Sequence, residues 1–262
     1  MKRHQWGSGA ARGRRSHGPV AAMVFSAILG LAAAAAAAET SQCVSCHETE
    51  RLGISLGHSF EDWRGSAHGR GGVTCEKCHG GDPNATDQTL AHKDVLPVSD
   101  AKSLVHPTRL PATCGACHQK EFTAFGKTIH ARKLASEGTG ATCYTCHGAM
   151  ATSLPSPSEL GARCAVCHKR PVPAQAALSY LAAAKTQLRR TLRTLDGMKS
   201  ANAEWYPRGL ERFHDLERTY GAIEIEWHTF AMDKVLHDSR DLLKLGKALD
   251  EEAGIRAQRP GQ

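Results

Sequence analysis

The pattern of apolar and polar positions divides the chain of 262 residues into three parts. An apolar, alanine-rich stretch runs from Val20 to Ala38. Residues 39–170 are interrupted by several prolines and by the glycine pairs Gly71-Gly72 and Gly80-Gly81, which predicts short helical turns and loops. Residues 171–262 have leucines at helical spacing. The expected fold is therefore mainly α, with long helices only in the C-terminal part.

In that C-terminal part the composition changes after Pro171 and Pro173 to alanine, leucine, arginine and glutamate. The first helix carries a leucine stripe and is expected to stop at Gly197. A second helix is expected to begin near Pro207, and a third to run over residues 222–249. Together they predict a helical bundle that covers the middle part or forms a homodimer face. The stripe consists of Leu178, Leu181, Leu188, Leu192 and Leu195.

The N-terminal part has the features of an export signal. Residues 1–19 hold five basic residues and no acidic one, and the apolar stretch ends in three alanines before Glu39. This predicts a signal peptide over residues 1–38 and export to the periplasm. The alternative is an uncleaved single-span anchor, since the 19 apolar residues approach the length that crosses a bilayer.

Net charge gives no reason to expect a nucleic-acid partner. The whole chain is formally +7, from 33 basic and 26 acidic residues. Removal of the leader takes away five basic residues and leaves about +2. A positive surface of the kind that binds phosphate backbones is therefore not expected.

All ten cysteines fall in five C-x-x-C-H motifs, numbered first to fifth in chain order. This motif is the attachment signature of haem c: two thiols form thioether bonds to the porphyrin, and the adjacent histidine coordinates iron. Disulfides, zinc knuckles and redox-active thiol pairs are the alternatives, but they do not explain a histidine after every pair. We therefore predict five covalently bound haem c groups. The thiols are Cys43, Cys46, Cys75, Cys78, Cys114, Cys117, Cys143, Cys146, Cys164 and Cys167, and the motif histidines are His47, His79, His118, His147 and His168.

The five motifs lie within residues 43–168, which leaves about 25 residues for each haem. So short a segment cannot wrap each haem in an apolar core of its own. We therefore expect the haems to pack against one another, to supply most of the core, and to conduct electrons along the stack.

Eight histidines remain outside the motifs and the leader. They exceed the five open axial positions, so we expect bis-histidine coordination with at least three histidines left over. His68 and His130 each precede a motif and are expected to end a short helix. His92 lies in a polar loop, whereas His58 is the easiest to interpret as a plain polar residue. In the C-terminal part His228 is the first choice of distal ligand, because Trp227 and Phe230 lie beside it, and His237 is the second. On one continuous helix the nine residues between them would place His237 on the opposite face from His228. The predicted distal ligands are His68, His92, His130, His228 and His237, with His106 and His214 also open.

These motifs resemble those of the multihaem cytochromes related to hydroxylamine oxidoreductase and pentahaem nitrite reductase, which include cytochromes of the c-552 and c-554 type. The resemblance covers residues 43–170 and rests on the first motif, on Trp63-x-x-Ser66-x-His68, and on Gly72-Val73 before the second motif. It implies that the histidines before the motifs, His68 and His130, are distal ligands. All five motifs here end in histidine, whereas the catalytic haem of the nitrite reductases has lysine.

We thus expect a periplasmic pentahaem electron carrier of an anaerobic or respiratory chain. Its expected partners are redox proteins, namely a membrane quinol dehydrogenase and a terminal reductase. The alternatives are a multihaem reductase of a small nitrogen or sulfur oxyanion and a membrane-anchored quinol dehydrogenase. The expected organisation is a signal peptide over 1–38, a haem-binding domain over 39–170 and a helical region over 171–262.

Overall fold

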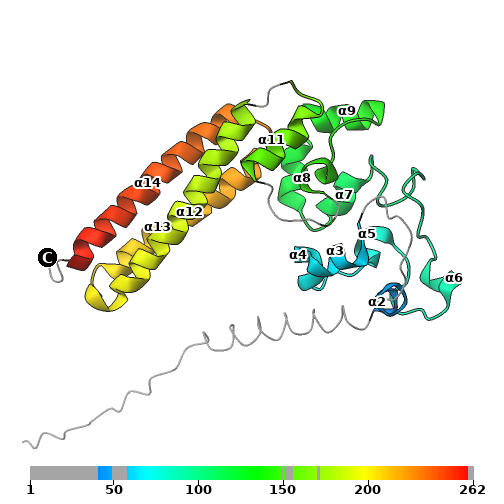
Figure 1. Cartoon of the computed structure of the whole chain (residues 1–262), viewed down its shortest axis with the longest axis horizontal. Helices are drawn as coiled ribbons and strands as arrows, with labels where there is room; N and C mark the ends of the chain where they lie inside the picture. The colour runs from blue at the N-terminus through cyan, green and yellow to red at the C-terminus, as the bar shows by residue number, and fades with distance from the viewer. Residues whose placement is uncertain (1–40, 49–57, 149, 151–155, 170–171, 259–262) are drawn as a thin grey trace, which may run out of the picture.

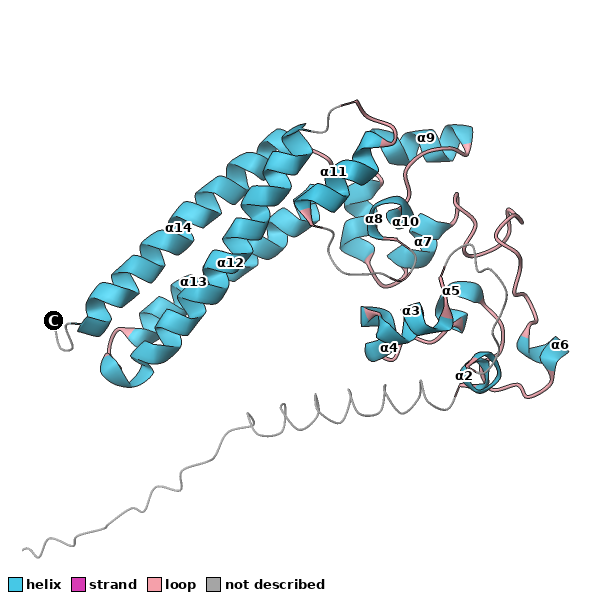
Figure 2. Ribbon diagram, in the orientation of Figure 1, coloured by secondary structure: helices cyan, strands magenta, loops and turns pink. Residues whose placement is uncertain are grey.

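The computed structural model describes residues 41–48, 58–148, 150, 156–169 and 172–258. Within these ranges the secondary structure is helical (Figures 1 and 2). This confirms the expected mainly α fold class. The predicted signal peptide, residues 1–38, lies outside the described residues, and no described helix is long and apolar enough to cross a membrane. The helices are α2 Gln42–His47, α3 Phe60–Gly65, α4 Ala67–Arg70, α5 Glu76–His79, α6 Gln88–Ala91, α7 Leu110–Gly115, α8 Gln119–Phe125, α9 Ile129–Glu137, α10 Cys143–His147, α11 Pro157–Ala165, α12 Val172–Ala201, α13 Tyr206–Trp227 and α14 Met232–Gln258.

The helices form two regions of different shape. The three long helices α12, α13 and α14 run side by side as a bundle, which we call the C-terminal bundle (Figure 1). The short helices α2–α11, which we call the motif region, gather beyond one end of this bundle (Figure 2). Contacts of α11 with α12 and of α8 with α13 join the two regions.

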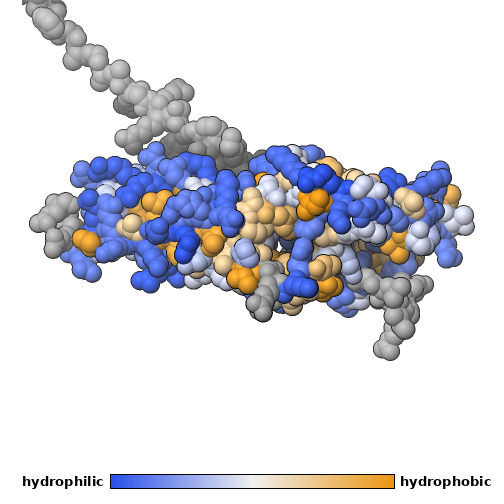
Figure 3. All heavy atoms as spheres, turned by 90° about the horizontal axis from the view of Figure 1, so that it is seen from above, coloured by the Kyte–Doolittle hydropathy of each residue, from blue (hydrophilic) through white to orange (hydrophobic). Residues whose placement is uncertain are grey.

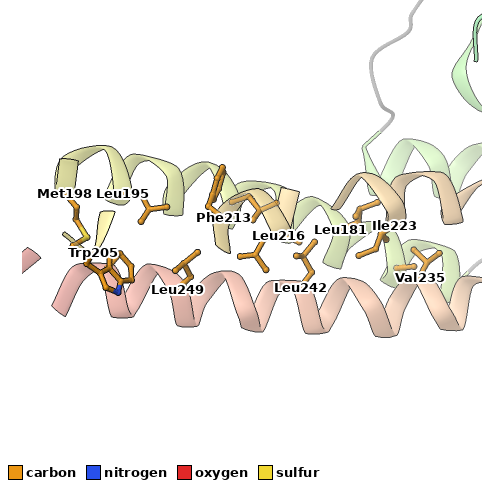
Figure 4. Close-up of a cluster of buried hydrophobic side chains, with 14 residues drawn as sticks. Leu181, Leu195, Met198, Trp205, Phe213, Leu216, Ile223, Val235, Leu242 and Leu249 are labelled. Carbon is orange, nitrogen blue, oxygen red and sulfur yellow. The ribbon is translucent and has the colours of Figure 1, made fainter. Parts of the chain in front are cut away.

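The C-terminal bundle has a continuous apolar core (Figure 4). Leu181 and Leu195 of α12 face Leu242 and Leu249 of α14, and all four side chains are buried. Burial of a leucine side chain is worth about 1.5–3 kcal/mol, so these rows stabilise the three helices against one another. Other residues of the core are Ala177, Ala184, Leu188, Met198, Trp205, Phe213, Leu216, Ile223, Val235 and Ala253.

Helices α12 and α14 approach closely at Gly246. The Thr191 hydroxyl donates a hydrogen bond across the helix pair to the Gly246 carbonyl at 3.1 Å. A Cβ at Gly246 would lie 3.1 Å from the side chain of Gln187 on α12, so a larger residue would force the helices apart. Glycine at this position therefore lets the bundle close tightly.

Two helix boundaries differ from those expected from the sequence. Gly197 lies inside α12 rather than at its end, because the buried Leu195 and Met198 on either side hold the helix together. Their burial outweighs the cost of about 1 kcal/mol for glycine in a helix. The helix expected over residues 222–249 is split, because α13 ends at Trp227 and α14 begins at Met232.

The motif region has few buried apolar side chains of its own. Among the described residues these are Trp63, Ala124, Phe125, Leu134 and Leu160. The face of the molecule seen in Figure 3 is largely hydrophilic, with hydrophobic residues scattered or in small groups. Packing of protein against protein is therefore concentrated in the C-terminal bundle.

Candidate haem-binding site

Each C-x-x-C-H motif is built on a helical turn. In the second, third and fifth motifs the N–H of the motif histidine donates to the carbonyl of the first cysteine, at 2.9, 2.9 and 2.8 Å respectively. Residues three and four positions apart in a helix share a face. The turn therefore presents both thiols and the imidazole on one side, which is what attachment and coordination of one haem require.

Glycine follows the motif histidine in two motifs and ends the helix there. Gly80 and Gly148 have φ angles of 79° and 72°, a region that side chains with a Cβ rarely adopt. A Cβ at Gly80 would also lie 3.3 Å from the carbonyl of Asp94. The chain can therefore turn away directly after the ligand.

Every motif histidine faces a second histidine from another part of the chain. Ring centres lie 5.9–6.1 Å apart in all five pairs. The second member of each pair comes from outside the motifs, and we call it the partner histidine. The pairs, motif histidine first, are His47 with His92, His79 with His58, His118 with His68, His168 with His130, and His147 with His228.

This spacing fits an iron held between two imidazoles. An imidazole nitrogen binds a transition metal at about 2.0 Å, so two rings on opposite sides of one iron have centres about 6 Å apart. Rings that stacked directly on each other would be closer. Among the described residues no group of three or more His, Cys, Asp or Glu side chains could hold a metal ion. The spacing of the histidine pairs, and not a cluster of other side chains, is thus what fits haem iron with two axial histidines.

Three partner histidines are oriented by hydrogen bonds to backbone carbonyls. The Nδ1 atoms of His92, His228 and His58 lie 2.8, 2.9 and 3.1 Å from the carbonyls of Gln88, Glu224 and Ser59. A carbonyl accepts only from a protonated Nδ1, so Nε2 is left as the metal-binding nitrogen. This is the usual arrangement by which a hydrogen bond fixes the tautomer of a ligand histidine.

His68 and His130 are positioned by capped helix starts instead. Ser66 caps α4 by accepting from the N–H of Gly69 at 3.0 Å, and His68 is the second residue of that helix. Thr128 caps α9 by accepting from the N–H of Ala131, also at 3.0 Å, and His130 is again the second residue. The two segments are copies of one unit, but each histidine begins a helix and does not end one as expected.

Burial favours the metal-binding form of these two imidazoles. It is the main cause that lowers the pKa of His68 and of His130, and the neighbouring histidine of each pair lowers it further. Neutral imidazole is the form that coordinates iron.

The two pre-motif histidines connect motifs that are separate in sequence. His68 precedes the second motif but faces His118 of the third, and His130 precedes the fourth motif but faces His168 of the fifth. The same crossing therefore occurs twice along the chain. Coordination by these histidines would tie each pair of motifs together across a haem.

The motifs also form an unbroken series. Burial and the nearby Cys43 thiol raise the pKa of Cys75 to about 11. The Cys78 thiol lies close enough to Cys114 for an electrostatic effect that, after burial, raises its pKa. Next, the thiols of Cys114 and Cys143 share a hydrogen bond, which raises the pKa of Cys114 and lowers that of Cys143.

The series ends with the fourth and fifth motifs. Burial, followed by the Cys164 thiol, raises the pKa of Cys146. Arg163 of the helix before the fifth motif donates to the Cys146 carbonyl. Each attachment site thus lies close enough to the next for their thiols to interact electrostatically, from the first motif to the fifth.

Four of the five predicted distal ligands lie opposite a motif histidine, namely His68, His92, His130 and His228. His58 lies opposite His79, although its sequence context gave no sign of a ligand. His237 does not face any motif histidine: its side chain is 73% exposed and its Nε2 lies 3.3 Å from a carboxylate oxygen of Asp241. The comparison of His228 and His237 as faces of one helix was wrong, because the turn between α13 and α14 separates them.

The two remaining histidines also lie apart from the pairs. His106 has its Nδ1 atom 2.8 Å from the Thr108 hydroxyl. His214 lies 3.0 Å from a carboxylate oxygen of Glu217 and is half exposed. The hydrogen bond from Nδ1 to the carbonyl four residues earlier, seen in His92 and His228, exists only in the folded chain and could not have ranked the candidates from the sequence.

Comparisons with known proteins give the same class. The family model described as cytochrome c7 and related cytochrome c matches residues 100–169, and that of cytochrome c554 and c-prime matches residues 4–80. The C-type polyheme cytochromes OmcB of two strains of Geobacter sulfurreducens are each 26% identical over 185 residues, 64% of this chain and 23% of theirs. The chain thus spans about a quarter of the length of these curated relatives. No solved structure matches.

The motifs, the helical fold and these matches define a multihaem c-type cytochrome. The chain binds haem c covalently through its C-x-x-C-H motifs.

Proposed function

We propose that this cytochrome is an exported, periplasmic electron-transfer protein with five haem c groups, each coordinated by two histidines. The observation that carries the proposal is the set of five histidine pairs at 5.9–6.1 Å, one for every motif. The cysteine pairs would attach the haems, the motif histidines would be the proximal ligands, and the partner histidines would be the distal ones.

Haem iron, when bound, supplies a reversible one-electron change between the ferric and ferrous states. The chain's own contribution is to fill both axial positions, so that no open site remains for a substrate. The hydrogen bonds from Nδ1 of His92, His58 and His228 keep these rings in place in either state. Such an arrangement supports electron transfer rather than reduction of a small oxyanion.

The proximity of successive motifs supports conduction through the whole length of the series. Electrons would enter near one end of the series and leave near the other, to redox proteins such as a membrane quinol dehydrogenase and a terminal reductase. We expect these encounters to be weak and short-lived, because a carrier must dissociate after each transfer. A homodimer through the C-terminal bundle, expected from the sequence, is part of the proposal, and light scattering of the holoprotein would detect it.

The relation to the cytochromes of hydroxylamine oxidoreductase and pentahaem nitrite reductase is part of the same proposal. It is supported by His68 and His130, since both pre-motif histidines lie opposite a motif histidine. Five motifs ending in histidine separate this chain from the catalytic members.

Mass and spectrum of the mature protein test the proposal together. Intact-mass measurement should give five haems on a chain that starts near Glu39, and the ferric spectrum at room temperature should contain only low-spin haem. Four haems or fewer in fully matured protein would contradict the count. A high-spin component, with steady turnover of nitrite, hydroxylamine or tetrathionate, would favour the reductase. A retained leader would favour the membrane-anchored quinol dehydrogenase.

A further inference from the structure

The turn between α13 and α14 reaches two haem sites at once. His228, at the end of α13, faces His147 of the fourth motif. Two residues later, the ring of Phe230 lies 4.7 Å from that of His130 at an angle of 86°. His130 in turn faces His168 of the fifth motif. One short turn of the C-terminal bundle therefore contacts the distal side of the last two sites.

Phe230 occupies this place at a conformational cost. Its φ angle is 59°, in the left-handed region where residues with a side chain are rarely found. Such backbone conformations are energetically unfavourable and tend to occur at functional sites. Glycine would fit the turn without strain, so the aromatic ring is not explained by the geometry of the turn.

His130 and His68 are the two partner histidines whose Nδ1 atom makes no hydrogen bond among the described residues, and of these two His130 contacts the ring of Phe230. In both histidines the Nδ1 atom is buried. His92, His58 and His228 all have a carbonyl at this atom, and His130 has the edge-to-face contact with Phe230. Aromatic pairs of this geometry are stabilising beyond the burial of their area. The ring contact can thus fix an imidazole that no hydrogen bond fixes.

We propose that Phe230 is a positioning residue for the haem of the fifth motif: it holds the His130 ring toward His168 and keeps hydrogen-bond acceptors away from Nδ1. The inference rests on the proposed bis-histidine coordination. A hydrogen bond from Nδ1 makes an imidazole more electron-donating and stabilises ferric iron. Without one, His130 gives the fifth site a higher reduction potential than a carbonyl-bonded histidine would.

The test compares Phe230→Gly with Phe230→Tyr in the holoprotein. Glycine removes the ring and relieves the backbone strain, so the turn itself remains favourable, while tyrosine keeps the ring. His130→Met identifies the signals of the fifth site, because only that axial ligand changes. The readouts are the ferric electron paramagnetic resonance spectrum, which depends on the angle between the axial ring planes, and the midpoint potential of each haem.

We expect Phe230→Gly to retain five haems, to alter the signal marked by His130→Met, and to lower the potential of that haem alone as water reaches Nδ1. The His147–His228 site, whose ring planes are nearly parallel at 13°, should keep its signal, whereas the planes of the fifth site are inclined by 64°. Phe230→Tyr should keep the parent signal and potential. A matched control is Phe213→Leu, which weakens the bundle core far from the turn and should leave the fifth site unchanged.

The inference is overturned if Phe230→Gly leaves the marked signal and potential as in the parent, or if Phe213→Leu changes them to the same extent. Failure of the proposed coordination would look different. In that case the parent itself would contain high-spin haem, or His130→Met would change no signal.

Discussion

The motif region and the C-terminal bundle are both helical, yet they are held together in different ways. Of the nineteen buried hydrophobic residues among those described, fourteen belong to the bundle core and five to the motif region. In the bundle, leucines of three long helices exclude water from one another. In the motif region, short capped helices surround histidine pairs that are separated by the width of an iron site. We therefore expect the bundle to fold on its side chains alone and the motif region to need its cofactors as a core.

Ion pairs also join the helices of the C-terminal bundle. Arg190 pairs with Asp250 at 2.9 Å and Arg212 with Glu252 at 2.7 Å, so ion pairs join α14 to both other helices of the bundle. Surface pairs of this kind contribute at most about 1 kcal/mol each. They help to align helices that are already held by an apolar core.

The largest expected effect follows from production of the chain without haem attachment. The motif region should then lose its fold, because too few apolar side chains remain to compensate for the entropy of ordering it. The C-terminal bundle should stay helical. Limited proteolysis with mass spectrometry should yield a protected fragment close to residues 172–258, whereas the holoprotein should be protected in both regions. Equal protection of the two regions in the haem-free chain would contradict the comparison.

A substitution in the apolar core should instead destabilise the C-terminal bundle. Leu242→Ala, at a side chain that is 2% exposed, should lower the free energy of unfolding by about 2–5 kcal/mol. Leu245→Ala lies on the same helix at a side chain that is 56% exposed and should change it by no more than about 0.5 kcal/mol. Denaturant unfolding followed by far-ultraviolet circular dichroism measures both.

The same experiment can be followed at the haems. Because His228 belongs to the bundle but faces His147, bundle unfolding should change the spectrum of the haem at the fourth motif. If the bundle of Leu242→Ala unfolds with no spectral change at any haem, His228 is not a ligand.

A smaller, local effect distinguishes His58 from His237. The sequence alone favoured His237 as a distal ligand, whereas in the structure His58 lies opposite a motif histidine. His58→Met should change the spectrum and potential of one haem, since methionine replaces imidazole opposite His79. His237→Met should change neither, because His237 is exposed and beside Asp241. Both variants should retain five haems by mass. A spectral change with His237→Met and none with His58→Met would refute the pairing.

The smallest effect concerns partner binding. Each ferric haem c adds about one negative charge through its propionates, so five haems shift the mature protein from about +2 to about −3. Electron transfer with a redox partner should therefore slow or accelerate modestly as ionic strength is raised, depending on the sign of the partner's charge. Stopped-flow rates over a salt series measure this dependence. A rate independent of salt would indicate contacts without an electrostatic component.

The sequence by itself determined the attachment sites and the presence of the bundle. A C-x-x-C-H motif is local: two thiols and an imidazole at positions i, i+3 and i+4 need only one helical turn, as the second, third and fifth motifs show. The leucine stripe of α12 is local in the same sense, because a helical period predicts which residues share a face.

Only the tertiary structure decided which histidine lies opposite which motif. His92 and His58 have nothing in their sequence neighbourhoods that distinguishes them from His106, His214 or His237. Partner histidines are chosen by the path of the chain, since two imidazoles must meet about 6 Å apart from segments far apart in sequence. The turn between α13 and α14 illustrates the reason. The apolar pattern there predicted one continuous helix, but the turn interrupts it and brings His228 and Phe230 to two different sites. Local spacing determines that one helical turn presents two thiols and an imidazole, whereas the closure of long loops determines which histidine lies opposite them.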